Sequence, residues 1–167
     1  IYYLLFTVHC SLFTPPPSMR LEDEIAQKQF RNQAHKLVVN IIYTYNWLMN
    51  YQQTMLKPHG ITGQQFNVLR ILRGQHPNPA SIKLVRERML DKMSDASRIV
   101  EKLRMKGLVE RHTCPTDRRV CDVTITAKGL ALLQILDKEN EKVNEMTERL
   151  TEDERQTVND LLDKMRG

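Results

Sequence analysis

Residues 81–126 read SIKLVRERMLDKMSDASRIVEKLRMKGLVERHTCPTDRRVCDVTIT, and this stretch decides the fold of the chain. Ser81 is predicted to be a helix N-cap, because its hydroxyl can accept a hydrogen bond from an unpaired N–H group of the first turn. The short helix that follows has an apolar face made of Ile82, Leu84, Val85 and Met89. Residues 90–93 then predict a tight turn.

A second helix is predicted directly after this turn. Ser94 is the expected N-cap, and the carboxylate of Asp95 suits the positive end of the helix dipole. Four apolar residues recur at helical spacing and predict one buried stripe, formed by Ala96, Ile99, Val100 and Leu103. Gly107 is expected to end the helix, because glycine tolerates the left-handed conformation that follows many helix ends.

A two-stranded hairpin is predicted next. Residues 108–113 form the first expected strand, and residues 120–125 form the second, in which apolar and polar side chains alternate. Pro115 to Asp117 are residues typical of a turn. Arg118 and Arg119 follow directly, so the tip of the hairpin is basic. Two helices joined by a tight turn and followed by such a hairpin are the layout of a winged helix-turn-helix, a mostly α fold with a small β-hairpin wing.

This layout predicts where DNA would be contacted. The second helix would enter the major groove, and its polar face would meet base edges and phosphates. The arginines at the tip would reach the DNA backbone or the narrow minor groove, with Asp117 orienting Arg119 through a charge-assisted hydrogen bond. Asp95 has two candidate roles, a bond to a cytosine amine and support of the helix dipole, and the second is favoured. The predicted DNA contacts are Ser94, Asp95, Ser97, Arg98, Lys102, Asp117, Arg118 and Arg119.

The same residues resemble the MarR family of transcriptional regulators. In that family a glycine before a Leu-Val-x-Arg sequence ends the recognition helix, as in residues 107–111 here. The family's Asp-x-Arg wing motif is matched by Asp117 and Arg119, and its Thr-x-x-Gly helix start by Thr126 and Gly129. The resemblance extends over residues 19–167 in layout and is specific between residues 90 and 129. It implies a dimer, and a ligand pocket between the dimerisation helices and the winged domain.

The charge of the chain is distributed unevenly. The 167 residues suit one domain with a core, and the formal net charge is +5. Residues 81–119 contain 11 Lys and Arg against 6 Asp and Glu, whereas residues 137–167 contain 6 against 10. Basic charge is thus concentrated at the predicted DNA contacts, as in nucleic-acid-binding proteins. An unevenly charged solvated surface is the alternative interpretation.

The two ends of the chain are predicted to differ in role. Residues 1–18 are apolar, uncharged and proline-broken, too short to span a membrane and without the basic start of a signal peptide. We interpret them as a leader outside the folded domain of residues 19–167, with an added dimer contact as the alternative. Residues 21–55 are expected to form one long helix with a wide apolar face.

Further helices are predicted on the C-terminal side. Thr62 to Gln65 and Thr151 to Glu154 are capping boxes. Thr126 is expected to cap a helix that runs to about Leu150. The winged helix-turn-helix thus spans about 62–126, with dimerisation helices at 21–55 and 127–167. Because these helices have more apolar surface than the winged domain can cover, we expect a homodimer that binds a palindromic operator with its recognition helices one DNA turn apart.

Catalytic motifs do not stand out in the sequence, so we expect no enzyme and no cofactor. His112, Cys114 and Cys121 lie close together and could bind zinc with a fourth ligand, or the cysteines could form a redox pair. The alternative is that they only fill the hairpin. Three cysteines at irregular spacing indicate a reducing cytoplasm rather than a disulfide framework, and no membrane association is expected. In thiol-sensing members of the family the cysteine lies near the first long helix, where only Cys10 of the leader is available.

An effector pocket is the last prediction. Aromatic side chains with polar tips suit a pocket for phenolic or aromatic acids, and a cation can pair with the ligand carboxylate. The candidate residues are Tyr43, Trp47, Tyr51, His59 and Arg70. Core and dimer packing is the alternative for each aromatic residue. The sequence therefore predicts a double-stranded-DNA-binding regulator, a repressor relieved by a small molecule, with a winged-helix protein–protein module or a redox-sensing regulator as the alternatives.

Overall fold

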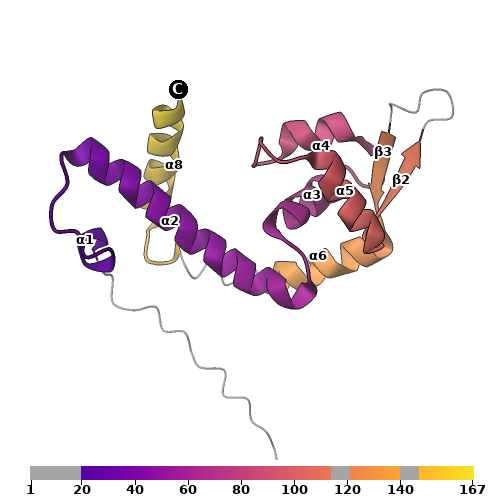
Figure 1. The fold of residues 1–167 in the computed structure, drawn as a ribbon, viewed down its shortest axis with the longest axis horizontal. Coiled ribbons are helices and arrows are strands. Elements are labelled where there is room, and N and C mark those ends of the chain that lie inside the picture. The colour runs from indigo at the N-terminus through magenta and orange to yellow at the C-terminus, as the bar shows by residue number, and fades with distance from the viewer. Residues whose placement is uncertain (1–19, 114–120, 140–146) are drawn as a thin grey trace, which may run out of the picture. The chain divides into compact units, whose positions relative to one another are not determined.

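The computed structural model describes residues 20–113, 121–139 and 147–167 (Figure 1). The chain divides into two compact units, residues 1–47 and residues 48–167, and each is described by itself. The predicted leader at residues 1–18 lies outside the described residues. Within the described part of the chain, no helix combines the length and the apolar character that crossing a membrane requires.

The first unit contains a break that the sequence analysis missed. A short helix α1 (Leu21–Glu24) precedes α2 (Gln33–Leu56), so the prediction of one helix over residues 21–55 is wrong. Ala26 adopts a left-handed conformation with φ of 52°, which a continuous right-handed helix excludes. Asn32 then caps α2, because its side-chain oxygen accepts a hydrogen bond of 2.8 Å from the N–H group of His35.

The helix α1 is tied to α2 by two carboxylates. Glu22 accepts a 2.5 Å hydrogen bond from the ammonium group of Lys36. This bond is the main reason why the pKa of Glu22 lies below its ordinary value. Glu24 accepts a 2.8 Å hydrogen bond from the hydroxyl of Tyr43. The chain therefore turns back between the two helices instead of continuing straight.

The second unit begins with a helix end that the sequence predicted. A single 3-10 turn, η1 (Lys57–His59), follows α2, and Gly60 then adopts φ of 65°. The next helix, α3 (Gly63–Arg73), has the predicted capping box. The N–H group of Gln65 donates to the hydroxyl of Thr62 over 3.3 Å, and the N–H group of Thr62 donates to the Gln65 side chain over 3.2 Å. Such reciprocal bonds satisfy two donors that the helix itself leaves unpaired.

The helix pair of the decisive stretch is also present. Ser81 caps α4 (Ile82–Arg88) as predicted, since its hydroxyl accepts a 3.1 Å hydrogen bond from the N–H group of Leu84. After a turn, α5 (Ala96–Met105) follows. Figure 1 shows α3, α4 and α5 grouped together, and each of these helices contacts the other two.

The sheet has three antiparallel strands in the order β1-β3-β2. The wing strands are β2 (Val109–Thr113), one residue shorter at its start than predicted, and β3 (Cys121–Ile125), whose predicted first residue lies outside the described residues. The third strand, β1 (Ala80–Ser81), was not predicted and pairs Ala80 with Val123. The tip of the hairpin, residues 114–120, lies outside the described residues.

The core of the second unit lies where α3, α5 and the sheet meet. Its fully buried side chains come from every element of the winged domain and from α6 (Ala127–Glu139). The largest of them are Leu56, Leu69, Leu72, Met89, Leu103, Leu133 and Leu136. In β3, Val123 and Ile125 are buried, as the predicted alternation requires.

The C-terminal helices follow the predicted caps. Thr126 caps α6, and its hydroxyl accepts a 3.1 Å hydrogen bond from the N–H group of Gly129. Residues 140–146 lie outside the described residues. A helix was predicted to run to about Leu150; Thr147 is helical, and a turn follows it in which the N–H group of Leu150 donates to the carbonyl of Thr147 over 3.0 Å. The predicted capping box of Thr151 and Glu154 then starts α8 (Glu152–Arg166).

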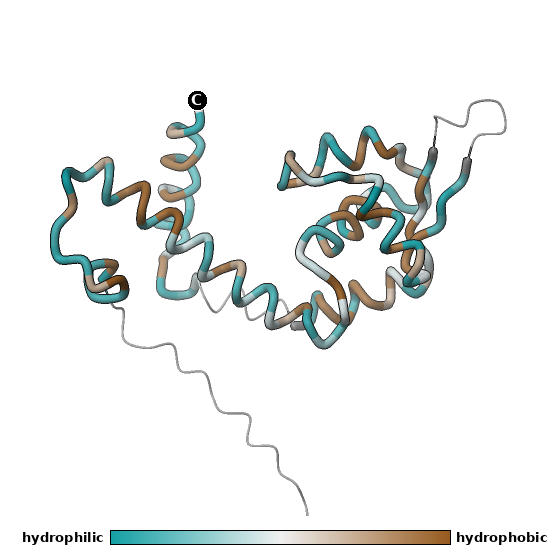
Figure 2. The backbone as a smooth tube through the Cα atoms, viewed as in Figure 1, coloured by the Kyte–Doolittle hydropathy of each residue, from teal (hydrophilic) through white to brown (hydrophobic). Residues whose placement is uncertain are grey.

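Two helices expose apolar side chains to solvent. Figure 2 shows that α2 and α8 carry hydrophobic as well as hydrophilic residues along their length. The exposed large apolar side chains of α2 are Leu37, Val38, Ile42, Tyr45, Trp47, Leu48 and Met49. Those of α8 are Val158, Leu161 and Met165. Apolar surface of this kind usually marks an interaction site.

Candidate nucleic-acid interface

The turn between α4 and α5 is fixed by hydrogen bonds. Leu90 donates from its N–H group to the side-chain oxygen of Asn67 over 3.0 Å. Asp91 accepts a 3.0 Å bond from the N–H group of Met93 with one carboxylate oxygen, and a 2.5 Å bond from the Ser94 hydroxyl with the other. The Ser94 hydroxyl, followed by the Met93 N–H group, lowers the pKa of Asp91. The backbone that leads into α5 therefore has a defined path.

The N-cap of α5 is Asp95 and not Ser94. The Asp95 carboxylate accepts a 3.1 Å hydrogen bond from the N–H group of Arg98, and α5 begins at Ala96. The predicted cap was wrong by one residue, and the Ser94 hydroxyl donates a hydrogen bond to the Asp91 carboxylate. A carboxylate at this position also interacts favourably with the positive end of the helix dipole.

The predicted stripe holds α5 against the rest of the domain. Ala96, Val100 and Leu103 are buried, and Ile99 packs against the core while partly exposed. Because of the helical period, the residues between them face the opposite way, and Ser97, Arg98 and Lys102 are exposed.

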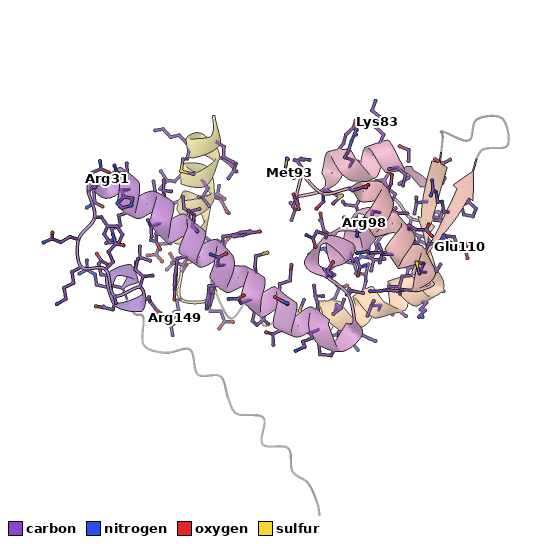
Figure 3. The ribbon with its side chains drawn as sticks, in the orientation of Figure 1. Arg31, Lys83, Met93, Arg98, Glu110 and Arg149 are labelled. Atoms are coloured by element: carbon purple, nitrogen blue, oxygen red, sulfur yellow. The ribbon has the colours of Figure 1, made fainter. Side chains whose placement is uncertain are left out.

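The cations on the exposed side differ in their availability. Glu101 accepts hydrogen bonds of 2.8–3.2 Å from the guanidinium of Arg104. This pairing lowers the pKa of Glu101 and raises the pKa of Arg104. The side chains of Arg98 and Lys102 form no hydrogen bond or ion pair with any residue that the structure describes. Their charges are therefore available to an external anion (Figure 3 labels Arg98 on α5).

The end of α5 connects it to the wing. Gly107 has φ of 69°, and its N–H group donates to the carbonyl of Arg104 over 2.8 Å. The prediction that glycine ends this helix is confirmed. The Thr126 hydroxyl donates to the carbonyl of Gly107 over 2.9 Å, and its N–H group donates to the carbonyl of Leu108 over 3.1 Å. The start of α6 thus holds the point where α5 passes into β2.

The predicted wing contacts remain predictions. Asp117, Arg118 and Arg119 belong to residues 114–120, outside the described residues, as does Cys114. His112 lies on β2, and its ring Nε2 is 3.1 Å from the hydroxyl of Thr124. In the described ranges, no group of three or more His, Cys, Asp or Glu side chains is arranged to bind a metal ion.

The five residues predicted for a ligand pocket lie in different environments. Tyr43 belongs to the first unit, and its bond to Glu24 raises its pKa. Trp47 belongs to the same unit and is 40% exposed. In the second unit, the Arg70 guanidinium lies 5.7 Å from the centre of the Phe66 ring, which is a cation–π contact. Tyr51 is partly buried on α2, and His59 lines a hollow.

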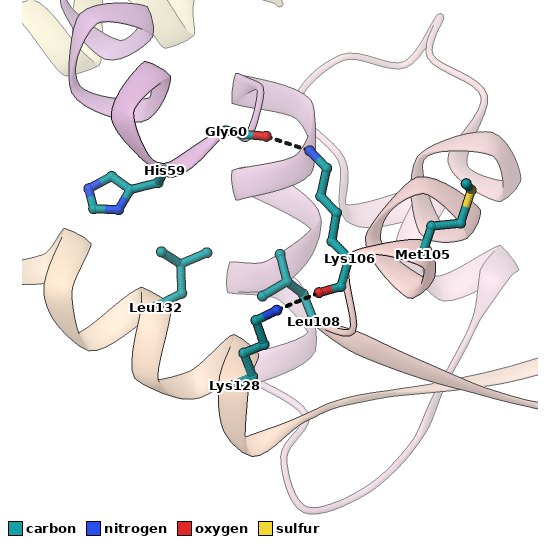
Figure 4. Close-up of a pocket in the computed structure, with 7 residues that line it drawn as sticks. All are labelled: His59, Gly60, Met105, Lys106, Leu108, Lys128 and Leu132. Atoms are coloured by element: carbon teal, nitrogen blue, oxygen red, sulfur yellow. Dashed lines mark hydrogen bonds between the residues drawn. The ribbon is translucent and has the colours of Figure 1, made fainter.

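This hollow has a volume of about 540 Å³ and carries two lysines (Figure 4). Its lining consists of His59, Gly60, Met105, Lys106, Leu108, Lys128 and Leu132. The Lys106 ammonium donates to the carbonyl of Gly60 over 2.5 Å and to the Gln65 side chain over 3.0 Å. The Lys128 ammonium donates to the carbonyl of Lys106 over 2.9 Å. Sequence reasoning missed both lysines, because only the fold brings residues 59, 106 and 128 together.

Comparisons with known proteins agree with this architecture. Residues 59–120 match the model of the MarR family. The chain is 28% identical over 131 residues to the HTH-type transcriptional regulator MhqR of Bacillus subtilis (strain 168), covering 78% of this chain and 89% of that protein.

Two solved structures are similar throughout their length. BpsR of Bordetella bronchiseptica, described with regulation of its DNA binding by 6-hydroxynicotinic acid, has a TM-score of 0.68 at 25% identity, covering 79% of this chain and 99% of that one. A mutant MarR from E. coli complexed with operator DNA has a TM-score of 0.64 at 25% identity, and the match covers 88% of this chain and 99% of that one. By sequence over residues 59–120, and by fold over most of its length, the chain is similar to winged-helix, DNA-binding transcriptional regulators of the MarR family.

Proposed function

We propose that this protein is a repressor that binds a palindromic operator as a homodimer and is released by a small aromatic acid. The observation that carries the proposal is the exposed side of α5. The side chains of Arg98 and Lys102 are solvent-exposed there and form no hydrogen bond or ion pair with a described residue, while the opposite stripe is buried in the core. Such a helix can enter the major groove without disturbing the fold.

The proposal separates residues that specify a sequence from residues that position the protein. Arg98 lies one turn inside α5, where its guanidinium can donate two hydrogen bonds to the O6 and N7 atoms of a guanine. Lys102, Ser97 and Ser94 supply further contacts with bases and phosphates. Arg118 and Arg119, with Asp117, are proposed to hold the wing against the DNA backbone or the minor groove.

Selection of bound sequences from a random duplex pool, at a stated salt concentration, tests the proposal. Arg98→Ala should then weaken binding to the selected site by about 1–3 kcal/mol and relax the preference at one position of each half-site. Arg119→Ala should weaken binding to all duplexes evenly and reduce the salt dependence by about one unit of slope. Arg31→Ala removes an exposed arginine of the first unit and is the matched control, with unchanged binding expected.

Two outcomes would contradict this assignment. An equal loss on the selected and a scrambled site for Arg98→Ala would mean that Arg98 contacts only the DNA backbone. If the native protein binds no duplex and the selection enriches no sequence, the alternative function, a protein–protein interaction module, is favoured.

The homodimer is supported by the exposed apolar side chains of α2 and α8. These include Ile42 at 55%, Tyr45 at 58% and Leu161 at 60% exposure, and a second copy would remove them from water. The expected result is a dimer in sedimentation equilibrium at micromolar concentration, and half-sites about 10 base pairs apart in the selected sequences. A stable monomer at that concentration would contradict this part of the proposal.

The effector is proposed to be an aromatic acid that pairs with cations of the protein. The aromatic candidates remain Tyr43, Trp47 and Tyr51, with Arg70 and His59 as cationic partners. Support comes from the hollow at His59, where two ammonium groups lie over an apolar floor that includes Leu108 and Leu132. The regulation of BpsR by 6-hydroxynicotinic acid is further support.

Titration of 6-hydroxynicotinic acid and of benzoic acid into the operator complex tests the effector. Release of DNA by either acid is expected, and Lys128→Met should raise the concentration that is needed. Lys138→Met, which removes an exposed lysine from the same helix α6, is the matched control. Unchanged DNA affinity at millimolar concentrations of both acids would contradict an aromatic acid effector.

A further inference from the structure

Two apolar side chains stand in water at the entry to the recognition helix α5. Leu90 is 86% exposed and Met93 is 95% exposed, whereas Met89, directly before them, is 1% exposed. Met93 lies two residues before the N-cap Asp95 (Figure 3). The two most exposed large apolar side chains in the described part of the chain thus lie in this turn.

The backbone of the turn that carries Met93 is held by hydrogen bonds. The Met93 N–H group donates to Asp91, whose other carboxylate oxygen accepts from Ser94, and Leu90 donates to Asn67. These bonds fix the backbone on both sides of the Met93 side chain. The side chain itself is left almost entirely to solvent, so the fold does not use it.

The surroundings of Met93 favour DNA over an apolar protein surface as its partner. The next residues along the chain lead into the exposed side of α5, with Arg98 and Lys102 free of described partners. Apolar surface adjacent to free cations suits a polyanion that also presents apolar groups. In the major groove, the apolar group at a base edge is the C5 methyl of thymine, and the start of a recognition helix contacts base edges there.

We propose that Met93 contacts the C5 methyl group of a thymine in each half-site and thereby determines specificity at that base pair. The proposal rests on the sequence-specific DNA binding proposed above, and it adds a contact that uses no hydrogen bond. The unbranched, polarizable methionine side chain can adapt to the position of the methyl group.

Deoxyuridine substitution isolates this contact, because uracil lacks only the methyl group and keeps the hydrogen-bonding pattern of thymine. Each thymine of the selected half-site is replaced in turn, and affinity is measured by fluorescence anisotropy. For the native protein, one replacement should weaken binding by about four-fold, the value expected for the burial of one methyl group. The other replacements should have smaller effects.

Variants of Met93 then assign the effect to the side chain. Met93→Gln keeps the length of the side chain but makes its end polar, and with this variant the sensitive thymine and its uracil analogue should bind equally. Met93→Leu should restore most of the difference. Met105→Gln is the matched control, since Met105 is 76% exposed at the far end of α5, and it should keep the four-fold difference.

The results distinguish failure of this inference from failure of the proposed function. If the native protein binds a selected site but no uracil replacement weakens it, the Met93 contact is refuted while the DNA-binding function stands. If the same penalty persists in Met93→Gln, another residue reads the methyl group, and Leu90→Gln identifies whether that residue is Leu90. If no duplex is bound specifically, the proposed function fails first, and the contact fails with it. Thermal melting of each variant shows whether the fold is kept. Because the Met93 side chain is 95% exposed, its substitution should leave the melting temperature unchanged.

Discussion

Gly129 offers the sharpest test of how the winged domain is held together. It lies in the first turn of α6, where its N–H group donates to the Thr126 hydroxyl. A Cβ atom at this position would lie 2.4 Å from the carbonyl oxygen of Leu108 and 2.7 Å from Cγ1 of Ile125. Both neighbours belong to the region where α5, the wing and α6 meet, so the close approach of α6 depends on glycine.

Gly129→Ala should therefore lower the free energy of unfolding. Overpacking costs about 1–3 kcal/mol, and a clash with a backbone carbonyl lies at the upper end, since no rotamer change relieves it. Alanine recovers about 1 kcal/mol through its better helix propensity. The net loss should be about 2 kcal/mol, seen as a lower urea midpoint at an unchanged m-value and a fixed protein concentration.

Gly63→Ala is the matched control for this experiment. It also changes a glycine in the first turn of a helix, α3, but the atom that a Cβ would meet is the end of the flexible Gln52 side chain, at 2.5 Å. That side chain can rotate away, so Gly63→Ala should cause no loss of stability, and the helix propensity of alanine should add up to about 1 kcal/mol. Equal stability of the two variants would refute the reasoning, because the cost at Gly129 would then not come from the Leu108 carbonyl.

Two further predictions concern the turn before α5. Asp95→Ala should lower the free energy of unfolding by about 1 kcal/mol through loss of the helix cap, whereas Asp95→Asn should keep most of the native stability. In chemical denaturation, a smaller loss for Asp95→Ala than for Ser94→Ala would show that Ser94 is the cap. Because the folded-state pKa of Asp91 is lowered, its contribution to stability is present above its unfolded pKa and is lost as the pH falls through the folded value. An NMR titration should find the pKa of Asp91 below the ordinary range in the native protein and closer to it in Ser94→Ala, and equal values would contradict the Ser94 contact.

The local caps were predictable where one residue alone could serve. Thr62, Ser81 and Thr151 each cap the helix that the sequence indicated, because no second Ser, Thr, Asn or Asp is directly adjacent to any of them. At residues 94 and 95, two good caps are adjacent, and propensity cannot choose between them. In the structure the Ser94 hydroxyl donates to Asp91, and the Asp95 carboxylate accepts the capping bond from the N–H group of Arg98.

Other features depended on contacts that the local pattern does not contain. The break between α1 and α2 requires a positive φ at Ala26, a residue that normally favours helix, so composition gave no signal apart from Asn32. The strand β1 has two residues and cannot show a period, and it exists because Ala80 pairs with Val123. The two lysines of the hollow lie before and after the wing in the sequence, so their spacing does not indicate that they share a site.

The construction of α5 explains how one fold can serve different operators. Its start is fixed by the Asp95 carboxylate, its end by Gly107, and its length by a stripe that includes Val100 and Leu103. These groups all act through the backbone or the buried side. The exposed side chains of Ser97, Arg98 and Lys102 form no hydrogen bond or ion pair with a described residue. Because stability and the proposed DNA contact are carried by different faces, we expect substitution on the exposed face to change the sequence that is read while the free energy of unfolding stays nearly constant.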